Sequence, residues 1–485
     1  MSIVPFGEWT PDQPDLAAGS TVATNVLPSD SSYRPAKAAA AISSAADARI
    51  MAMEYGEDPA QNVFVFAANA TKIYRYTQGT LTSVSKSGNY TTAAGERWTF
   101  CKFGPRMIAA NFTHATQSYV MGTSSLFADL NAAAPKARTL ATVRDFVVMG
   151  DINESSTNYA NRVRWSALGD PTNWTIGTST QSDYQDIFGG GNVQAIVGGE
   201  YGLIFMKRSI HRMNYVGSPL IFQFDEIASN RGLAARDAVT KIGNMVFFLD
   251  RDGFYMYDGR ALQPIGAGKV DRYFWSNCAF GSTDRITCAA DPINGLVAWS
   301  YISNTDTTGN PDRVIVYNWR TGRWSEFRAA HQLIGDITTI EYTVEQLDTV
   351  NANLDNHTIS FDSSAFKGGD VLFATAIDHK LATFTGATLA AEIETPEAAF
   401  ADTRRSVIRS IRPIVDGGTL TMQIGTRNRI NDAVVYGSTV AQNAAGFCPF
   451  RAEGRYHRAK LYVAAGSTWS EASGLEFDAV AGGMR

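Results

Sequence analysis

The chain has 485 residues, a formal net charge of −5 and an isoelectric point near 5.8, and 18% of its residues are charged. This balance disfavours tight nucleic-acid binding, because proteins that grip DNA carry a basic excess that displaces counterions from phosphates. Gly (42), Phe (26), Tyr (19) and Trp (9) are plentiful. Aromatic residues favour half-buried strands and glycines suit tight turns, so the composition predicts a mostly β protein.

The beginning of the chain does not resemble a targeting signal. Residues 1–9 hold a proline and an acid where a signal peptide needs a basic and then an apolar run. No stretch approaches the ~20 apolar residues of a membrane span. We therefore expect synthesis and folding in a cytoplasm. The four cysteines lack any Cys-x-x-Cys pair, which favours reduced, buried thiols at Cys101, Cys278, Cys288 and Cys448.

Residues 1–44 are predicted to form an extended N-terminal arm. Prolines at positions 5, 11, 14, 28 and 35 exclude a long helix and confine any strand to a sheet edge. Apolar residues such as Phe6, Trp9 and Tyr33 are too frequent for a disordered tail. We expect the arm to pack on the C-terminal part of the chain and to add a strand to it.

Residues 45–402 show a repeated strand pattern, which is most regular between Val193 and Gly266. Two similar units follow one another there, each with an apolar strand, a glycine turn, a buried strand and an aromatic strand. Their closing glycines, Gly217 and Gly259, lie 42 residues apart. This spacing is typical of one blade of a β-propeller, in which four antiparallel strands occupy roughly 40–50 residues.

Similar but less regular units begin near Ala48, Trp98, Arg144 and Ile286. The last of these is followed by a predicted hairpin over Tyr317–Trp324, with a glycine in its turn. Exposed insertions are expected at Asn153–Asn161 and around Val344–Asn356. The count of units predicts an all-β fold with a β-propeller of six or seven irregular blades.

Residues 403–485 have longer alternating strands and ten arginines. We predict a separate β-sandwich-like platform domain here. The arginines of Arg404–Arg412 and Arg451–Arg458 have two interpretations. Arginine suits bidentate recognition at an interface with a partner subunit, but alternation also places these side chains on more than one face, as in a solvated strand.

A search for chemistry yields no catalytic, cofactor-binding or metal site, and we predict that the protein is not an enzyme. The segment Ser166–Trp174 comes closest to a sialidase Asp box, but its Asp–Gly order is wrong and it occurs once. A glycosidase needs two placed carboxylates, which no local pattern marks. Gly189-Gly-Gly-Asn lacks the Gly-Lys-Ser/Thr of a phosphate loop. No metal-binding spacing joins His114, His211, His331, His357, His379 and His457.

Three stretches together resemble the tail nozzle, or tail hub (tail tubular) subunit, of short-tailed bacteriophages, which is of β-propeller type. They are Pro14 to Pro35 of the arm, Trp165 to Trp174, and Phe247 to Gly259. The resemblance covers most of the chain from the arm through the propeller, and it matches the C-terminal domain only in outline.

The resemblance implies a virion structural protein, made in the host cytoplasm, of which six copies form a ring at the distal end of the tail. The ring would dock to an adaptor, or head-to-tail connector, and a tail fibre or tailspike would attach nearby. Its channel would retain the genome before infection, closed by the subunits themselves or by a tail needle, and would then serve its ejection. Genomic DNA would pass through the lumen without specific binding, in keeping with the acidic chain. Two alternatives stay open. One is a carbohydrate-active or ligand-binding propeller, and the other is a WD-repeat scaffold, although the Gly-His and Trp-Asp signatures are absent.

Overall fold

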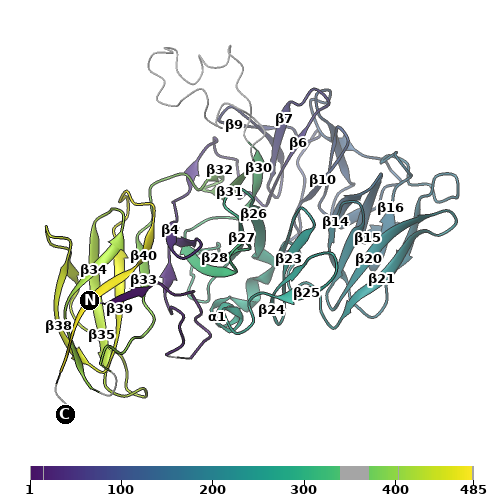
Figure 1. Cartoon of the computed structure of the whole chain (residues 1–485). Helices are drawn as coiled ribbons and strands as arrows, with labels where there is room; N and C mark the ends of the chain where they lie inside the picture. The colour runs from purple at the N-terminus through teal and green to yellow at the C-terminus, as the bar shows by residue number, and fades with distance from the viewer. Residues whose placement is uncertain (1, 15, 339–370, 402–403, 483–485) are drawn as a thin grey trace, which may run out of the picture.

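The computed structural model describes residues 2–14, 16–338, 371–401 and 404–482 (Figure 1). Strands dominate these residues, and the helices are short: α1 (Asp271–Asn277) and the 3-10 helix η1 (Phe280–Arg285). The predicted all-β class is confirmed. The predicted insertion around Val344–Asn356, together with His357, lies outside the described residues.

The middle of the chain folds into seven antiparallel groups of four strands, named here the first to the seventh strand group in chain order. The first group consists of β6 (Ala52–Glu57), β7 (Val63–Ala68), β8 (Ile73–Thr77) and β9 (Thr80–Ser83). The second consists of β10 (Thr99–Phe103), β11 (Arg106–Ala110), β12 (Gln117–Val120) and β13 (Ala128–Asp129). The third consists of β14 (Lys136–Val143), β15 (Phe146–Glu154), β16 (Thr157–Trp165) and β17 (Asp183–Asp186).

The remaining groups follow the same plan. The fourth consists of β18 (Val193–Val197), β19 (Gly202–Met206), β20 (Ser209–Gly217) and β21 (Ile221–Ser229). The fifth consists of β22 (Val239–Ile242), β23 (Met245–Asp250), β24 (Gly253–Tyr257) and β25 (Leu262–Pro264). The sixth consists of β26 (Thr287–Asp291), β27 (Leu296–Tyr301), β28 (Arg313–Asn318) and β29 (Arg323–Arg328). The seventh consists of β30 (Ile334–Thr338), β31 (Val371–Ile377), β32 (Lys380–Thr383) and β5 (Ala40–Ala41).

The two units predicted within Val193–Gly266 are the fourth and fifth strand groups. Their second strands, β19 and β23, are continuous apolar runs because packing covers both of their faces, whereas the fourth strand β25 is largely exposed. The predicted hairpin over Tyr317–Trp324 is confirmed as the connection between β28 and β29, and Gly322 in its turn has φ +73°.

The first strands of the seven groups form a closed circuit of contacts. β6 contacts β10, and the series continues through β14, β18, β22, β26 and β30, which contacts β6 again. The seventh group is completed from the start of the chain, because β5 pairs with β32. Backbone hydrogen bonds between β5 and β32 therefore join the beginning and the end of the segment that forms the seven strand groups.

The strands of residues 391–482 and the short strands of the arm form one further sheet and extend the sheet of the sixth strand group, and we call these two parts the C-terminal module. One sheet contains β1 (Ser2–Pro5), β3 (Val26–Pro28), β4 (Tyr33–Pro35), β34 (Ser406–Val415), β38 (Cys448–Gly454) and β40 (Ala472–Ala481). The other contains β2 (Ala23–Thr24), β33 (Ala391–Glu394), β35 (Leu420–Arg427), β36 (Val435–Tyr436), β37 (Val440–Ala441) and β39 (Tyr456–Val463). The buried side chains of both sheets belong to one core, and β33 precedes the predicted boundary at residue 403.

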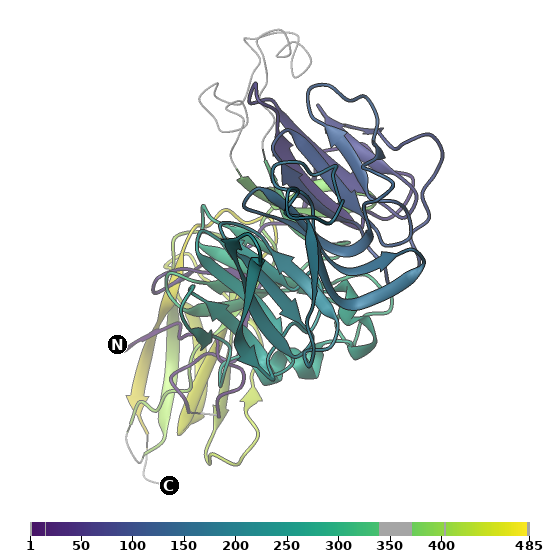
Figure 2. The ribbon, with the colours of Figure 1, turned by 90° about the vertical axis from the view of Figure 1, so that its right-hand side faces the viewer.

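Strand β2 links the C-terminal module to the sixth strand group. It pairs in parallel with β29 and antiparallel with β33, so a single ten-stranded sheet runs through both parts. The arm and the C-terminal strands lie at one end of the molecule in Figure 1, and β15, β16, β20 and β21 lie at the opposite end. Figure 2, turned by 90°, shows the arm running beside the C-terminal strands.

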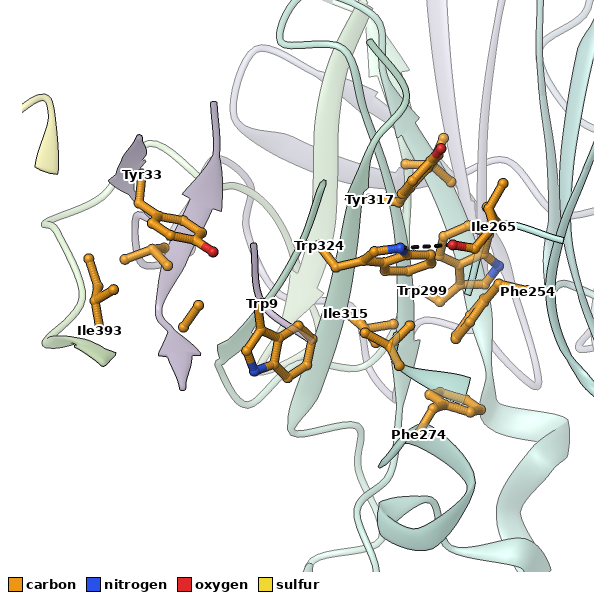
Figure 3. Close-up of a cluster of buried hydrophobic side chains, with 14 of the residues drawn as sticks. Trp9, Tyr33, Phe254, Ile265, Phe274, Trp299, Ile315, Tyr317, Trp324 and Ile393 are labelled. Atoms are coloured by element: carbon orange, nitrogen blue, oxygen red, sulfur yellow. Dashed lines mark hydrogen bonds between the residues drawn. The ribbon is translucent and has the colours of Figure 1, made fainter. Parts of the chain in front are cut away.

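The largest core cluster spans this link (Figure 3). Trp299 and Trp324 stack with ring centroids 5.9 Å apart, and the Trp324 indole N–H donates to the carbonyl of Ile265 at 3.1 Å. Trp9 and Tyr33 of the arm belong to the same cluster. The arm is therefore part of the core, as the apolar residues of its sequence predict.

Candidate functional site

The first strands of all seven groups surround a central cavity of about 520 Å³. Each strand contributes backbone and side chains to its wall, because the strands lie side by side around the circuit. The wall includes Glu54, Cys101, Leu140, Ile196, Thr240, Cys288 and Asp336, one residue from each group.

One mouth of the cavity, where the first strands begin, is crossed by charged side chains that precede or open these strands. Arg97, before β10, pairs with Asp237 at 2.6 Å. The same guanidinium donates to the carbonyls of Met51 and Asp284, each at 3.1 Å. Arg97 therefore connects the second group with the entries to the first, fifth and sixth groups.

Glu96 accepts from two further arginines at this mouth. Arg138 of β14 lies 2.7 Å from Glu96, and Arg236 lies 2.9 Å from it. Arg138 also pairs with Asp151 at 2.8 Å. Burial lowers the pKa of Arg138, but its hydrogen bonds to Glu96 and Asp151 and the charges of these acids outweigh burial, so that its pKa is raised.

We call these residues the mouth lattice: Glu96, Arg97, Arg138, Asp151, Arg236 and Asp237. Their charges are paired with one another and with backbone carbonyls. These ion pairs and hydrogen bonds connect strand groups that are not neighbours in the circuit of first strands. Because its N–H donors are bonded within the protein, the mouth lattice stabilises the arrangement of the strand groups and leaves few polar groups free to bind a ligand.

Two carboxylic acids lie deeper in the cavity, on the contacting strands β6 and β30. Burial raises the pKa of Glu54 from 4.5 to about 7, and its one backbone donor, the Tyr55 N–H at 3.1 Å, opposes the shift. Burial and the charge of Glu54 raise the pKa of Asp336 from 3.8 to about 7, although the Ala290 N–H at 3.3 Å lowers it. Both acids therefore change protonation near neutral pH.

Two cysteines also line the cavity. Burial raises the pKa of Cys101 to about 12 and that of Cys288 well above its ordinary value. Since the thiolate is the nucleophile, neither thiol is activated for attack at neutral pH. Cys101, Cys278 and Cys448 are buried, Cys288 is partly buried, and all four are free thiols.

Some of the residues considered in the sequence as possible sites form hydrogen bonds within the chain. In Ser166–Trp174, the Trp174 indole donates to the carbonyl of Pro171 at 2.9 Å, and Arg164 donates to the carbonyl of Trp174 at 2.7 Å. Among histidines, His211 and His457 contact serine hydroxyls at 2.9 and 2.8 Å. No three metal-ligating side chains gather within the described residues.

The C-terminal arginines fall into two sets, one buried and one exposed. Arg427 and Arg458 are buried and pair with Glu397 at 2.5 and 2.9 Å, so they stabilise the module. Arg409 and Arg412 of β34, with Arg451 of β38, are exposed on the sheet that contains β34, β38 and β40. All three are exposed to solvent, and Arg412 also lies 3.9 Å from Glu476.

Sequence reasoning did not identify the mouth lattice. A signal for it exists, because an acid and an arginine stand side by side before three first strands, as Glu96-Arg97, Arg236-Asp237 and Asp284-Arg285. To recognise this signal, the sequences of the strand groups must be aligned with one another at the beginning of their first strands. No helix of the described residues is long and apolar enough to cross a membrane.

No protein-family model matches the chain. No curated protein matches it either. Among solved structures, the computationally designed Ika8 protein is similar over 78% of this chain and 99% of its own, with 12% identity and a TM-score of 0.38. The extracellular domain of a putative one-component system from B. thetaiotaomicron is similar over 86% of this chain, which spans 48% of that domain, with 11% identity and a TM-score of 0.40. These likenesses assign no function.

Proposed function

We propose that the seven strand groups are the blades of a β-propeller, and that the protein is a structural subunit of a ring: the nozzle or hub at the end of a short bacteriophage tail. The closed circuit of first strands and its completion by β5 support the propeller. The role in a virion rests on the resemblance of the arm and of two stretches of the propeller to that family.

The observation that carries the structural role is the arm, which connects the two parts of the molecule. The guanidinium of Arg323, in β29, donates to five carbonyls of the arm, those of Phe6, Gly7, Ser29, Asp30 and Ser32, at 3.0–3.4 Å. It also stacks on the ring of Tyr33. Ser325 Oγ donates to the carbonyl of Val26 at 2.7 Å. These hydrogen bonds fix the arm to the sixth strand group and so make the connection between the strand groups and the C-terminal module rigid, as a subunit under mechanical load requires.

Charge is distributed so that copies can associate head to tail. Residues 403–485 hold eleven Arg and Lys against six Asp and Glu, whereas the first 402 residues hold 31 against 41. A basic segment, residues 403–485, and an acidic remainder in one chain favour contacts between different surfaces of neighbouring copies, which close into rings when the rotation permits. The exposed arginines of β34 and β38 are the groups we assign to such contacts.

In this proposal the genome passes between copies. The central cavity of one chain holds about 520 Å³ and the mouth lattice crosses it, so it is too small for a DNA duplex. The proposed lumen is the space enclosed by the ring, and an adaptor ring, a fibre or tailspike and a needle are its proposed partners. The proposed location is the tail of the virion.

The experiment compares ring assembly by the full chain with assembly by a variant that lacks the hydrogen bonds between Arg323 and the arm. The full chain, Arg323→Met and the control Arg320→Met are mixed with an adaptor ring and studied by light scattering and electron microscopy. We expect rings from the full chain and the control. Arg323→Met should cost about 3 kcal/mol, because buried carbonyls lose charged donors, and should expose residues 2–41 to protease. A full chain that stays monomeric on the adaptor would contradict the proposal.

A second candidate, a carbohydrate-active propeller, is favoured by Glu54 and Asp336. Two acids with pKa values raised to about 7 in a central cavity are suited to proton transfer at a glycosidic bond. Release of sugar from host-surface glycan, lost in both Glu54→Gln and Asp336→Asn, would establish it. Full activity of either variant would remove these acids from catalysis.

A further inference from the structure

Three arginines from distant parts of the chain lie close together beside the mouth lattice, and we call them the arginine triad: Arg49, Arg97 and Arg285. They precede β6, β10 and β26, the first strands of the first, second and sixth strand groups. Arg97 connects the three segments, because it donates to the carbonyl of Met51, two residues after Arg49, and to the carbonyl of Asp284, the residue before Arg285. These two hydrogen bonds hold the segments of the other two arginines against one guanidinium group.

The positive charges of the triad act on one another. Burial, followed by the charges of Arg285 and Arg97, lowers the pKa of Arg49 from 12.5 to about 10, and the charge of Asp284 opposes the shift. Burial and the charge of Arg97 also lower the pKa of Arg285. Charges separated by more than about 10 Å are largely screened in 0.1 M salt, so the three guanidinium groups are near neighbours. Each one therefore disfavours the charged form of the next.

The nearby acids leave part of this charge uncompensated. Asp237 is paired with Arg97 at 2.6 Å. Asp284 is exposed, and neither Arg49 nor Arg285 forms an ion pair with it or with any other described residue. Three cationic side chains thus stand against two acids, of which one is paired. A positive potential remains at the triad, and it favours a negatively charged ligand.

Arg49 has the free donors that such a ligand requires. Its side chain is partly buried, and its N–H groups have no acceptor among the described residues. Its nitrogens are nevertheless open to solvent, since none of them belongs to the buried nitrogens that lack a partner. Arg285 is held by neutral acceptors, the carbonyl of Gly309 at 3.1 Å and the amide oxygen of Asn310 at 3.4 Å. A free guanidinium beside two fixed ones suits the bidentate recognition of an oxyanion.

We propose that the arginine triad binds a small oxyanion of the phosphate class, held by hydrogen bonds from Arg49 and by the charges of Arg97 and Arg285. A phosphate group carries about −1.5 to −2 charges at pH 7 and has oxygens for more than one guanidinium, whereas a carboxylate has a single charge and two oxygens. Inorganic phosphate and a phosphate ester offer the same chemistry, and the experiment distinguishes them. The proposal is independent of the ring-forming role.

The test is calorimetric titration of the full chain with inorganic phosphate and with glycerol phosphate, at constant ionic strength. We expect saturable binding at one site. Arg49→Gln should weaken it at least tenfold, because charge-assisted hydrogen bonds are lost. The matched control is Arg260→Gln, which removes an exposed arginine from the turn between β24 and β25 and should leave the affinity unchanged. Binding of both probes would support a site that admits an ester, and binding of inorganic phosphate alone would support one that encloses the ion.

Melting curves separate ligand binding from a structural role of Arg49. Without phosphate, Arg49→Gln should melt no lower than the parent chain, since Arg49 has no partner to lose among the described residues. Phosphate at millimolar concentration should raise the Tm of the parent and of Arg260→Gln but not that of Arg49→Gln. Arg49→Lys keeps the charge without the planar fork and should bind severalfold more weakly, and it decides the matter if Arg49→Gln fails to fold. No saturable binding, equal shifts of Tm, or undiminished affinity in both Arg49 variants would overturn the proposal.

Discussion

Replacing Glu96 by Gln tests whether the mouth lattice holds the body together. The side chain of Glu96 is 13% exposed and neutralises two arginines, Arg138 and Arg236, which are 20% and 27% exposed. Gln keeps the shape but removes the charge, which leaves Arg236 without its carboxylate. Arg138 keeps Asp151, whose side chain is 1% exposed.

The expected loss follows from burial. Removing one partner of a fully buried ion pair costs about 3–5 kcal/mol, and partial exposure reduces this, so we expect Glu96→Gln to lower the free energy of unfolding by about 2–4 kcal/mol. Glu200→Gln is the matched control. It removes the same charge from an exposed pair with Arg144, whose side chains are 37% and 79% exposed, and should cost about 0–1 kcal/mol.

The assay is urea unfolding followed by tryptophan fluorescence, at low salt and at 1 M NaCl. The Debye length is about 3 Å at 1 M, so the small effect of Glu200→Gln should vanish there, and most of the effect of Glu96→Gln should persist. A double-mutant cycle with Arg236→Met should give a coupling of about 1 kcal/mol or more. Equal effects of the two Glu→Gln substitutions, or no coupling, would refute the role of the lattice.

The remaining predictions concern titratable groups of the interior. Because the pKa values of Glu54 and Asp336 are raised to about 7 from 4.5 and 3.8, the folded chain binds more protons than the unfolded chain between about pH 4 and pH 7, and thermal stability should fall as pH rises through this window. Glu54→Gln should flatten that dependence and stabilise the chain at pH 8 by about 1–3 kcal/mol, and an unchanged pH profile would contradict the assignment. Burial raises the pKa of Cys278 to about 12 and that of Cys448 to about 11, so Ellman's reagent at pH 8 should label none of the four thiols until urea is added; rapid labelling of the folded chain would count against their burial.

Local patterns predicted those parts of the fold that local physics determines. In Val193–Gly266 the alternation of side chains and the glycine turns mark β18–β25, since within each of the two strand groups each strand pairs with the next one along the chain. The apolar residues of the arm likewise predicted that it packs on the body, and Trp9 and Tyr33 are buried.

The parts that were not predictable depend on distant partners. Strands β2 and β5 have two residues each, too few for any periodicity, and they exist because β29, β33 and β32 offer free edges. The mouth lattice joins residues as far apart in the sequence as Glu96 and Arg236, which are 140 residues apart.

The completion of the seventh strand group by β5 has a consequence for biosynthesis. The N–H of Leu381 donates to the hydroxyl of Ser43, from which it is separated by 338 residues. At about 5–20 residues per second, a ribosome needs roughly 20–70 s to make the intervening chain. Until then β5 has no edge to pair with, although β2 of the arm can pair with β29 as soon as that strand has been made. Completion of the seventh strand group is therefore a late step of synthesis, and a nascent chain stalled before residue 380 should remain open to protease at residues 40–43.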